Sequence, residues 1–241
     1  MPQREELRAE LLELIKDNKE GLGAETPETQ RIDTLIDELV QHTLYPGALN
    51  HPDVFKGHWA GSYVSFGRLV GGKGATDEGT GVTTSLRVFS MGRLPDIPAT
   101  QVYSGLEIEP SNGTYNFYQR LRVGEGNIET NHFTYGRYLK KDEDEDRFFV
   151  EFDKFEVGPS DPDMSLEDYR KAIGVEPSDP LEAVLSPSPK LWSHVAYMDD
   201  DLRIHLGQMG GHYVMLRTEL PMYALEHAKG NRINPPSETA A

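Results

Sequence analysis

Apolar residues recur at helical spacing in the first forty positions of the chain. Residues 7–15 carry one stripe of Leu and Ile, and residues 32–40 carry a second with the i, i+3, i+4, i+7 spacing of a half-buried helix. Thr26 followed by Pro27 is a favourable start for that second helix. We predict a helical hairpin over residues 1–42 that packs one face against a larger body.

The pattern changes to a period of two after Trp59, which is typical of strands with one buried face. Turn residues divide the candidate strands, and closure into a barrel is what removes their exposed edges. We predict a mainly β domain over residues 55–229, an antiparallel barrel of about eight to ten strands with the helical hairpin before it. The candidate strands are 59–66, 82–89, 101–108, 115–123, 128–139, 148–157, 192–197, 202–206 and 212–217.

Two segments depart from the strand pattern. Residues 159–189 are rich in Pro and Asp and contain two short helical patterns, 165–173 and 179–185, so we expect a partly helical insertion. Residues 230–241 are rich in Pro, Ser and Thr, and we expect a flexible tail.

Composition narrows the classes of function. The chain of 241 residues has 24 Lys and Arg against 40 Asp and Glu, a formal net charge of −16, with no basic patch, so no nucleic-acid partner is expected. The absence of Cys excludes disulfides and thiolate metal sites. No apolar run reaches the ~20 residues of a transmembrane helix. The first residues lack a secretory signal, so a cytoplasmic location is expected.

The chain contains no complete catalytic or metal-binding motif. Residues 67–74 approach a phosphate-binding loop, but Gly74 replaces the hydroxyl residue and no helix is predicted to follow. His205 and His212 flank the last turn and lack a nearby third ligand for zinc. We therefore expect no metal and no cofactor.

Aromatic and Arg side chains on the candidate strands are the remaining candidates for a ligand site. An Arg inside a barrel is costly unless it meets a ligand anion or a buried carboxylate. We expect Arg203 to orient a polar group of a ligand, beside wall residues that supply apolar area. The full candidate set is Trp59, Tyr63, Phe117, Phe133, Tyr135, Arg203 and His205.

Two segments resemble the plastid lipid-associated protein (PAP)/fibrillin family. The first runs from Glu10 to Trp59 and ends in Gly-His-Trp, and the second, 195–216, contains Tyr-Met-Asp-Asp-Asp-Leu-Arg-Ile. The resemblance implies a lipocalin-like barrel that binds lipids, carotenoids or quinones, and it leaves peripheral contact with thylakoid or other membranes open. The chain differs from the family pattern at Leu206 and Met209, where the family commonly has basic residues.

Three functions stay open at this stage. The first is lipocalin-like binding of an apolar or amphiphilic small molecule of lipid, isoprenoid, carotenoid or quinone type. The second is a cyclase or isomerase without cofactor, in which Tyr, His and Arg act on an apolar substrate confined in the same cavity. The third is an assembly partner with a solid interior. The ligand and the oligomeric state are not fixed by the sequence.

Overall fold

A computed structural model of the chain describes residues 2–17, 26–65, 83–140, 143–208 and 211–219. Its longer helices are α1 (Pro2–Asp17), α2 (Pro27–Val40) and α5 (Leu166–Ile173), and the short ones are η1 (Ala48–Asn50), α3 (Pro52–Phe55) and α4 (Leu86–Phe89). The strands are β1 (Gly57–Val64), β2 (Thr83–Ser85), β3 (Pro98–Glu109), β4 (Thr114–Val123), β5 (Ile128–Lys140), β6 (Arg147–Pro159), β7 (Glu182–Val184), β8 (Lys190–Met198), β9 (Leu202–Gly207) and β10 (His212–Thr218).

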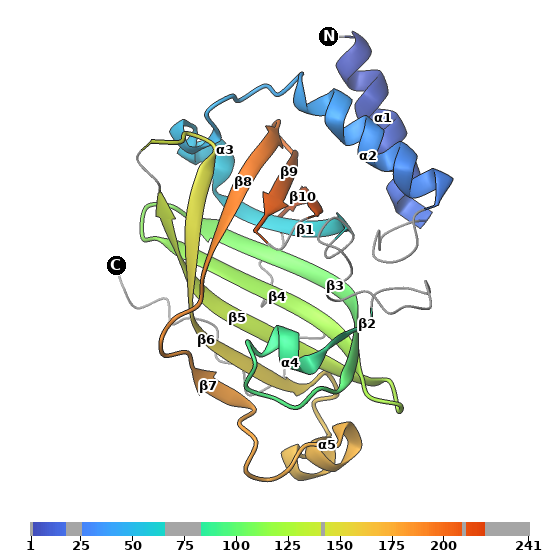
Figure 1. Ribbon diagram of the computed structural model, residues 1–241, viewed down its shortest axis with the longest axis vertical. Helices are drawn as coiled ribbons and strands as arrows, with labels where there is room; N and C mark the ends of the chain where they lie inside the picture. Colours follow the sequence, from blue (N-terminus) through green and yellow to red (C-terminus); the bar gives the residue numbers. More distant parts are fainter. Residues whose placement is uncertain (1, 18–25, 66–82, 141–142, 209–210, 220–241) are drawn as a thin grey trace.

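All the described strands belong to one antiparallel sheet. They follow the order β1-β10-β9-β8-β6-β5-β4-β3-β2, and β7 pairs with β6 outside this path. β1 also pairs with β3, from Gly57 opposite Ile108 to Ala60 opposite Gly105. Within the described residues, eight strands therefore form a ring (Figure 1). The expectation of a mainly antiparallel β fold is confirmed.

Side-chain alternation sorts each strand into an inner and an outer face. On β4, Phe117 pairs with Leu106 of β3 and with Thr134 of β5, and these positions face the inside of the ring. The next residue, Tyr118, pairs with Phe133, and both lie on the outer face of the ring. The position of a residue along its strand therefore determines whether its side chain lies inside or outside the ring.

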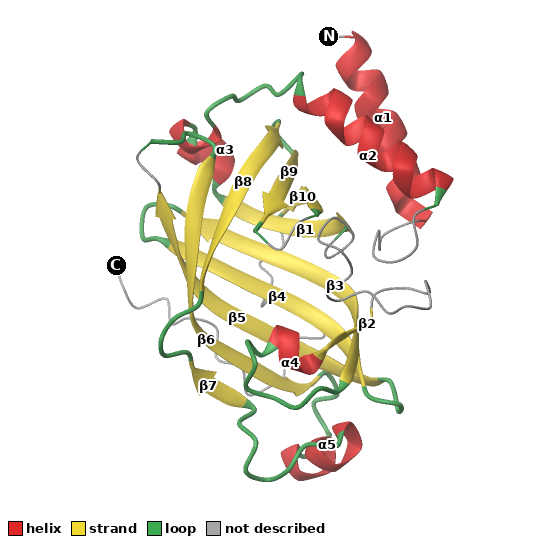
Figure 2. Cartoon of the chain, in the orientation of Figure 1, coloured by secondary structure: helices red, strands yellow, loops and turns green. Residues whose placement is uncertain are grey.

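Two hydrophobic clusters occupy these two compartments. One lies inside the ring and includes residues of η1, α3, α4 and α5. In Figure 2, α3 lies near one end of the strands, and α4 and α5 lie toward the other. The other lies outside, between the helical pair α1 and α2 and the outer face of β1, β8, β9 and β10. Ile32, Ile36 and Leu39 of α2 are fully buried there, against Tyr63 and Ile204 among others.

The end of the ring at η1 and α3 is closed by aromatic and Arg side chains. Trp59 lies between the guanidinium groups of Arg203 and Arg217, whose central carbons are 4.4 and 4.2 Å from its ring centroids. Gly57 has a φ of +121°, and a Cβ there would lie 2.7 Å from Arg217 Nη1. The glycine of the Gly-His-Trp sequence is thus favoured by its positive φ, and Arg217 packs against it.

Two sequence-based assignments are wrong. Residues 82–89 were expected to form a strand, but the described part contains the three residues of β2 followed by α4, whose buried Leu86 packs into the inner cluster. Residues 179–185 were expected to be helical, but they contain β7, which pairs with the long strand β6. In both cases a tertiary contact overrides a short local pattern.

Some expectations concern parts of the chain that the structure does not describe. The loop 67–74 and the tail 230–241 lie outside the described residues. Among the helices that are described, none combines the length and the apolar character that crossing a membrane requires.

Candidate functional site

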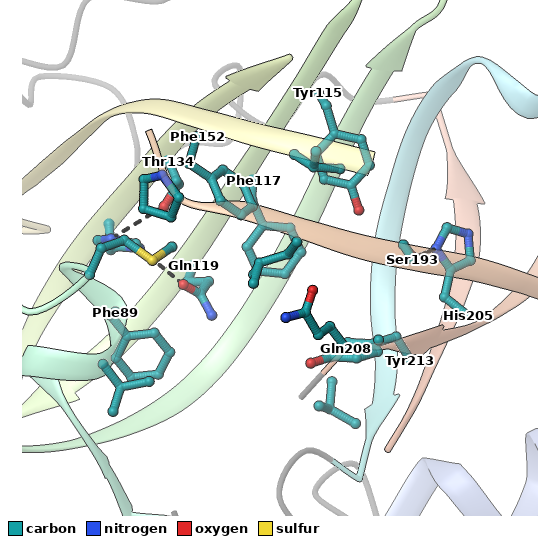
Figure 3. A pocket seen from close by; sticks show the side chains of 18 of the residues that line it. Phe89, Tyr115, Phe117, Gln119, Thr134, Phe152, Ser193, His205, Gln208 and Tyr213 are labelled. Atoms are coloured by element: carbon teal, nitrogen blue, oxygen red, sulfur yellow. Dashed lines mark hydrogen bonds between the residues drawn. The ribbon is translucent and has the colours of Figure 1, made fainter. Parts of the chain in front are cut away.

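The inside of the ring contains a pocket of about 310 Å³, between its two packed ends. Side chains of β3 to β6 and β8 to β10, together with α4, surround it (Figure 3). None of the lining residues is an Asp, Glu, Lys or Arg. They are Val64, Val88, Phe89, Met91, Gln101, Tyr115, Phe117, Gln119, His132, Thr134, Val150, Phe152, Pro189, Leu191, Trp192, Ser193, His205, Gly207, Gln208, Tyr213 and Met215.

Most of the wall is aromatic or aliphatic. Phe117 of β4 and Phe152 of β6 project into the pocket from neighbouring parts of the sheet, and Phe89 reaches it from α4 (Figure 3). Val88 also lines the pocket and is 45% exposed, which places the entrance beside α4. The pocket is therefore an apolar chamber that opens next to a short helix.

A polar chain crosses one part of the wall, on β3, β4 and β5. Gln119 donates to Gln101 Oε1 at 2.6 Å, and its own Oε1 lies 3.0 Å from Nδ1 of His132. The other ring nitrogen of His132 lies 3.4 Å from Thr134 Oγ1. Burial is the main influence and lowers the pKa of His132 to about 4, although a backbone hydrogen bond with Phe89 acts in the opposite direction. His132 is therefore neutral at pH 7.

A second polar group joins β8 and β9. Arg203 Nε donates to His205 Nε2 at 2.7 Å, so that nitrogen carries the lone pair. The proton of His205 therefore sits on Nδ1, which donates to Ser193 Oγ at 2.9 Å. Burial, and then the charge of Arg203, hold the pKa of His205 well below its usual range. His205 is a neutral imidazole in a fixed tautomer.

Arg203 is fully buried directly behind this histidine. Its Nη1 donates to the carbonyl of Phe55 at 3.0 Å, and its guanidinium stacks on the rings of Phe55 and Trp59. Burial lowers the pKa of Arg203 to about 9, so the group stays charged at pH 7. Among the described residues no carboxylate forms an ion pair with it. The charge at this end of the ring is uncompensated.

Comparison with known proteins does not assign the chain. No protein-family model matches it, and none of the curated proteins does. The described residues also contain no group of three or more His, Cys, Asp or Glu placed to hold a metal ion.

The predicted site residues fall into three places. Phe117 and His205 line the pocket, and Trp59 and Arg203 lie inside the ring at its closed end. Tyr63 lies in the outer cluster against α1 and α2. Phe133 and Tyr135 face outward on β5, next to Tyr118 and Lys154. The structure therefore brings four of the seven candidates to the interior and three to the outer face.

Several pocket residues were not singled out from the sequence. Tyr115 and Gln119 share the face of Phe117 on β4, so the alternation along that strand was a usable signal. Tyr213 pairs with His205 across β9 and β10, while His212 pairs with Leu206 and faces Asp33 on the outside. That register depends on the turn after Gly207, which the sequence does not specify.

Proposed function

We propose that the protein binds an apolar or amphiphilic small molecule in this pocket, with the strand ring acting as a lipocalin-like barrel. The observation that carries the proposal is a pocket of about 310 Å³, open beside α4, with apolar walls and a few placed polar side chains. Sites for small molecules have this composition, and their volumes begin at about 300 Å³. A solid core, as expected for an assembly protein, would be packed to a density that leaves few voids larger than a water molecule.

The resemblance to the PAP/fibrillin family supports the same proposal. That family is expected to hold lipids, carotenoids or quinones, and the resembling segment 195–216 supplies Arg203, His205 and Tyr213 to the pocket or to its closed end. The shared motif therefore coincides with one of the two polar groups of the wall, the one on β8 and β9. We infer a ligand with an apolar body and one polar end.

Binding is favoured over a cyclase or isomerase reaction by the state of the two pocket histidines. Both nitrogens of His132 and both of His205 have hydrogen-bond partners, and burial keeps each ring neutral. A general base or acid works best with a pKa near the working pH. Neither histidine meets this condition.

Titration with N-phenyl-1-naphthylamine, a neutral apolar dye that fluoresces on leaving water, tests the proposal. We expect saturable binding to the protein and a loss of affinity of at least tenfold in Val88→Trp, because the larger ring fills the entrance beside α4. The matched control is Val184→Trp, on β7, where the valine is 73% exposed and does not line the pocket. Equal affinities in both variants, or no saturable binding to the unmodified protein, would contradict the proposal.

A further inference from the structure

Three hydrogen-bond donors at one end of the pocket have no acceptor. Within the described residues, no hydrogen bond contributes to the pKa of the Tyr115 or Tyr213 hydroxyl, and both residues line the pocket. Burial raises the pKa of Tyr115 to about 12 and also raises that of Tyr213, so both phenols remain protonated donors. Gln208 uses its Oε1 to accept from Trp192 N at 3.1 Å, which leaves its amide nitrogen uncommitted. Figure 3 shows these side chains entering the same part of the pocket.

A buried positive charge lies behind these donors. Arg203 contacts the pocket wall by donating a hydrogen bond to His205. Its charge also lowers the pKa of Tyr115, which burial raises. Its Nη2 is buried and has no hydrogen-bond partner in the described part of the chain. An unpaired buried charge is costly, and it favours an anion in the adjacent space.

No side chain that lines the pocket carries a negative charge. No Asp or Glu is among the lining residues, although acidic residues outnumber basic ones in the whole chain by 40 to 24. Acceptors such as Gln119 Oε1 and Gln101 Oε1 lie in the other polar group and are already engaged. The end of the pocket formed by Tyr115, Tyr213 and Gln208 therefore presents donors and positive potential, and no free negative group.

We propose that the ligand is an acidic amphiphile, bound with its carboxylate between Tyr115, Tyr213 and Gln208 and its apolar body toward Phe117 and Phe152. This inference rests on the proposed function, because it names the ligand class of the same pocket. Two phenol hydroxyls and an amide can donate to the two oxygens of one carboxylate, and hydrogen bonds to an ionised acceptor are about twice as strong as neutral ones. Arg203 supplies the compensating charge without touching the bulk solvent.

Isothermal titration calorimetry with decanoate, 1-decanol and decylamine at pH 7.5 tests the inference. The three ligands share one chain and differ in the head group. We expect decanoate to bind at least tenfold more tightly than 1-decanol, and decylamine more weakly than both. The net charge of −16 acts in the opposite direction, since it attracts the amine, so this order can only come from the local site.

Variants test which residues cause the preference for decanoate over 1-decanol. Arg203→Gln should reduce the ratio between decanoate and 1-decanol to less than threefold, whereas Arg137→Gln, on an exposed Arg paired with Asp153, should leave it unchanged. If Arg203→Gln does not fold, Tyr213→Phe provides the test. It should weaken decanoate about tenfold and 1-decanol less than threefold, with the outward-facing Tyr135→Phe as control.

The outcomes separate the two proposals. Equal affinity for decanoate and 1-decanol, or tighter binding of decylamine, would overturn the acidic ligand and leave the binding function in place. A preference for decanoate that survives both Arg203→Gln and Tyr213→Phe would overturn the assigned head-group site. Binding of none of the three ligands would overturn the acidic amphiphile, and failure of the neutral dye to bind as well would overturn the binding function.

Discussion

His132 and His205 show how the interior keeps titratable groups uncharged. Each is buried inside the ring, and each has partners that use both ring nitrogens without a carboxylate among them. Desolvation is the largest influence on both pKa values and lowers them. The histidines therefore stabilise the fold only while they are neutral.

The pKa of His132 predicts a loss of stability in mild acid. It is about 4 in the folded protein against an ordinary value of 6.5, so the unfolded chain binds the proton more readily. The stability that the neutral ring contributes is complete above pH 6.5 and decreases as the pH falls toward 4. Between pH 7.5 and pH 5.0 we expect the free energy of unfolding to fall by about 2 kcal/mol through this residue, since each unit corresponds to about 1.4 kcal/mol.

Urea denaturation of the protein and of His132→Gln at the two pH values measures this effect. Gln retains a donor and an acceptor but does not titrate, so the variant should lose about 2 kcal/mol less than the unmodified protein on acidification. His205 remains in both proteins and cancels in the comparison. An identical loss in both would show that His132 is not the group responsible.

At the scale of elements, β9 is the strand that connects the two hydrophobic clusters. Arg203 and His205 face the inside of the ring, whereas Leu202 and Ile204 pack outward under α1 and α2. The turn before it is fixed by Asp199, whose carboxylate accepts from Tyr197 and from the backbone of Leu202 and lies 3.2 Å from Arg8 of α1. The acidic run 199–201 is thus a structural feature of this turn and of helix docking.

Truncating a buried side chain of α2 should lower the stability of the protein without changing its affinity for the dye. Ile36→Ala removes a fully buried side chain from the outer cluster and should lower the free energy of unfolding by about 2–5 kcal/mol. The affinity for N-phenyl-1-naphthylamine should change less than twofold, because Ile36 does not line the pocket. Leu44→Ala, at a residue 44% exposed, is the control and should cost less than 1 kcal/mol in urea denaturation. A large loss of dye binding in folded Ile36→Ala would mean that the two clusters are not independent.

For the whole molecule, the contact between β1 and β3 closes the ring of described strands. Four residue pairs form this contact between β1 and β3. Just beyond them, a Cβ on Gly61 of β1 would lie 1.9 Å from Ser104 Oγ of β3. No side chain can be added at position 61 unless Ser104 moves. An alanine here would therefore have to displace the Ser104 hydroxyl.

A double-mutant cycle tests the importance of this closure. Gly61→Ala should destabilise the protein by about 1–3 kcal/mol, as overpacking does in a dense interior. Ser104→Ala removes the hydroxyl that clashes, so the double variant should recover part of the loss, and the two changes should not be additive. Additive effects measured by thermal or urea unfolding would show that the two residues do not meet.

Sequence periodicity predicted the strands well where one face of a long strand is buried, as along β4 and β5. It failed at 82–89, where the short helix α4 forms with Leu86 packed into the inner cluster, and at 179–185, where β7 pairs with the distant strand β6. The site was predicted only in part for a related reason. Whether Tyr135 or Thr134 faces inward depends on pairing register and on bulges such as the one between Tyr135 and Gly136, which residue types alone do not specify.

The alternation of β9 between the inside and the outside of the ring has a consequence for how related sequences can vary. Because neighbouring positions of β1 and β9 enter different compartments, the deletion of one residue before Arg203 would carry the cation to the helices and an isoleucine to the chamber. Such a deletion would place an Arg in the apolar cluster under α1 and α2, which is costly. Insertions and deletions in these two strands should therefore be far rarer in homologues than substitutions. Any that occur should come in pairs, so that the same side chains again face the inside of the ring.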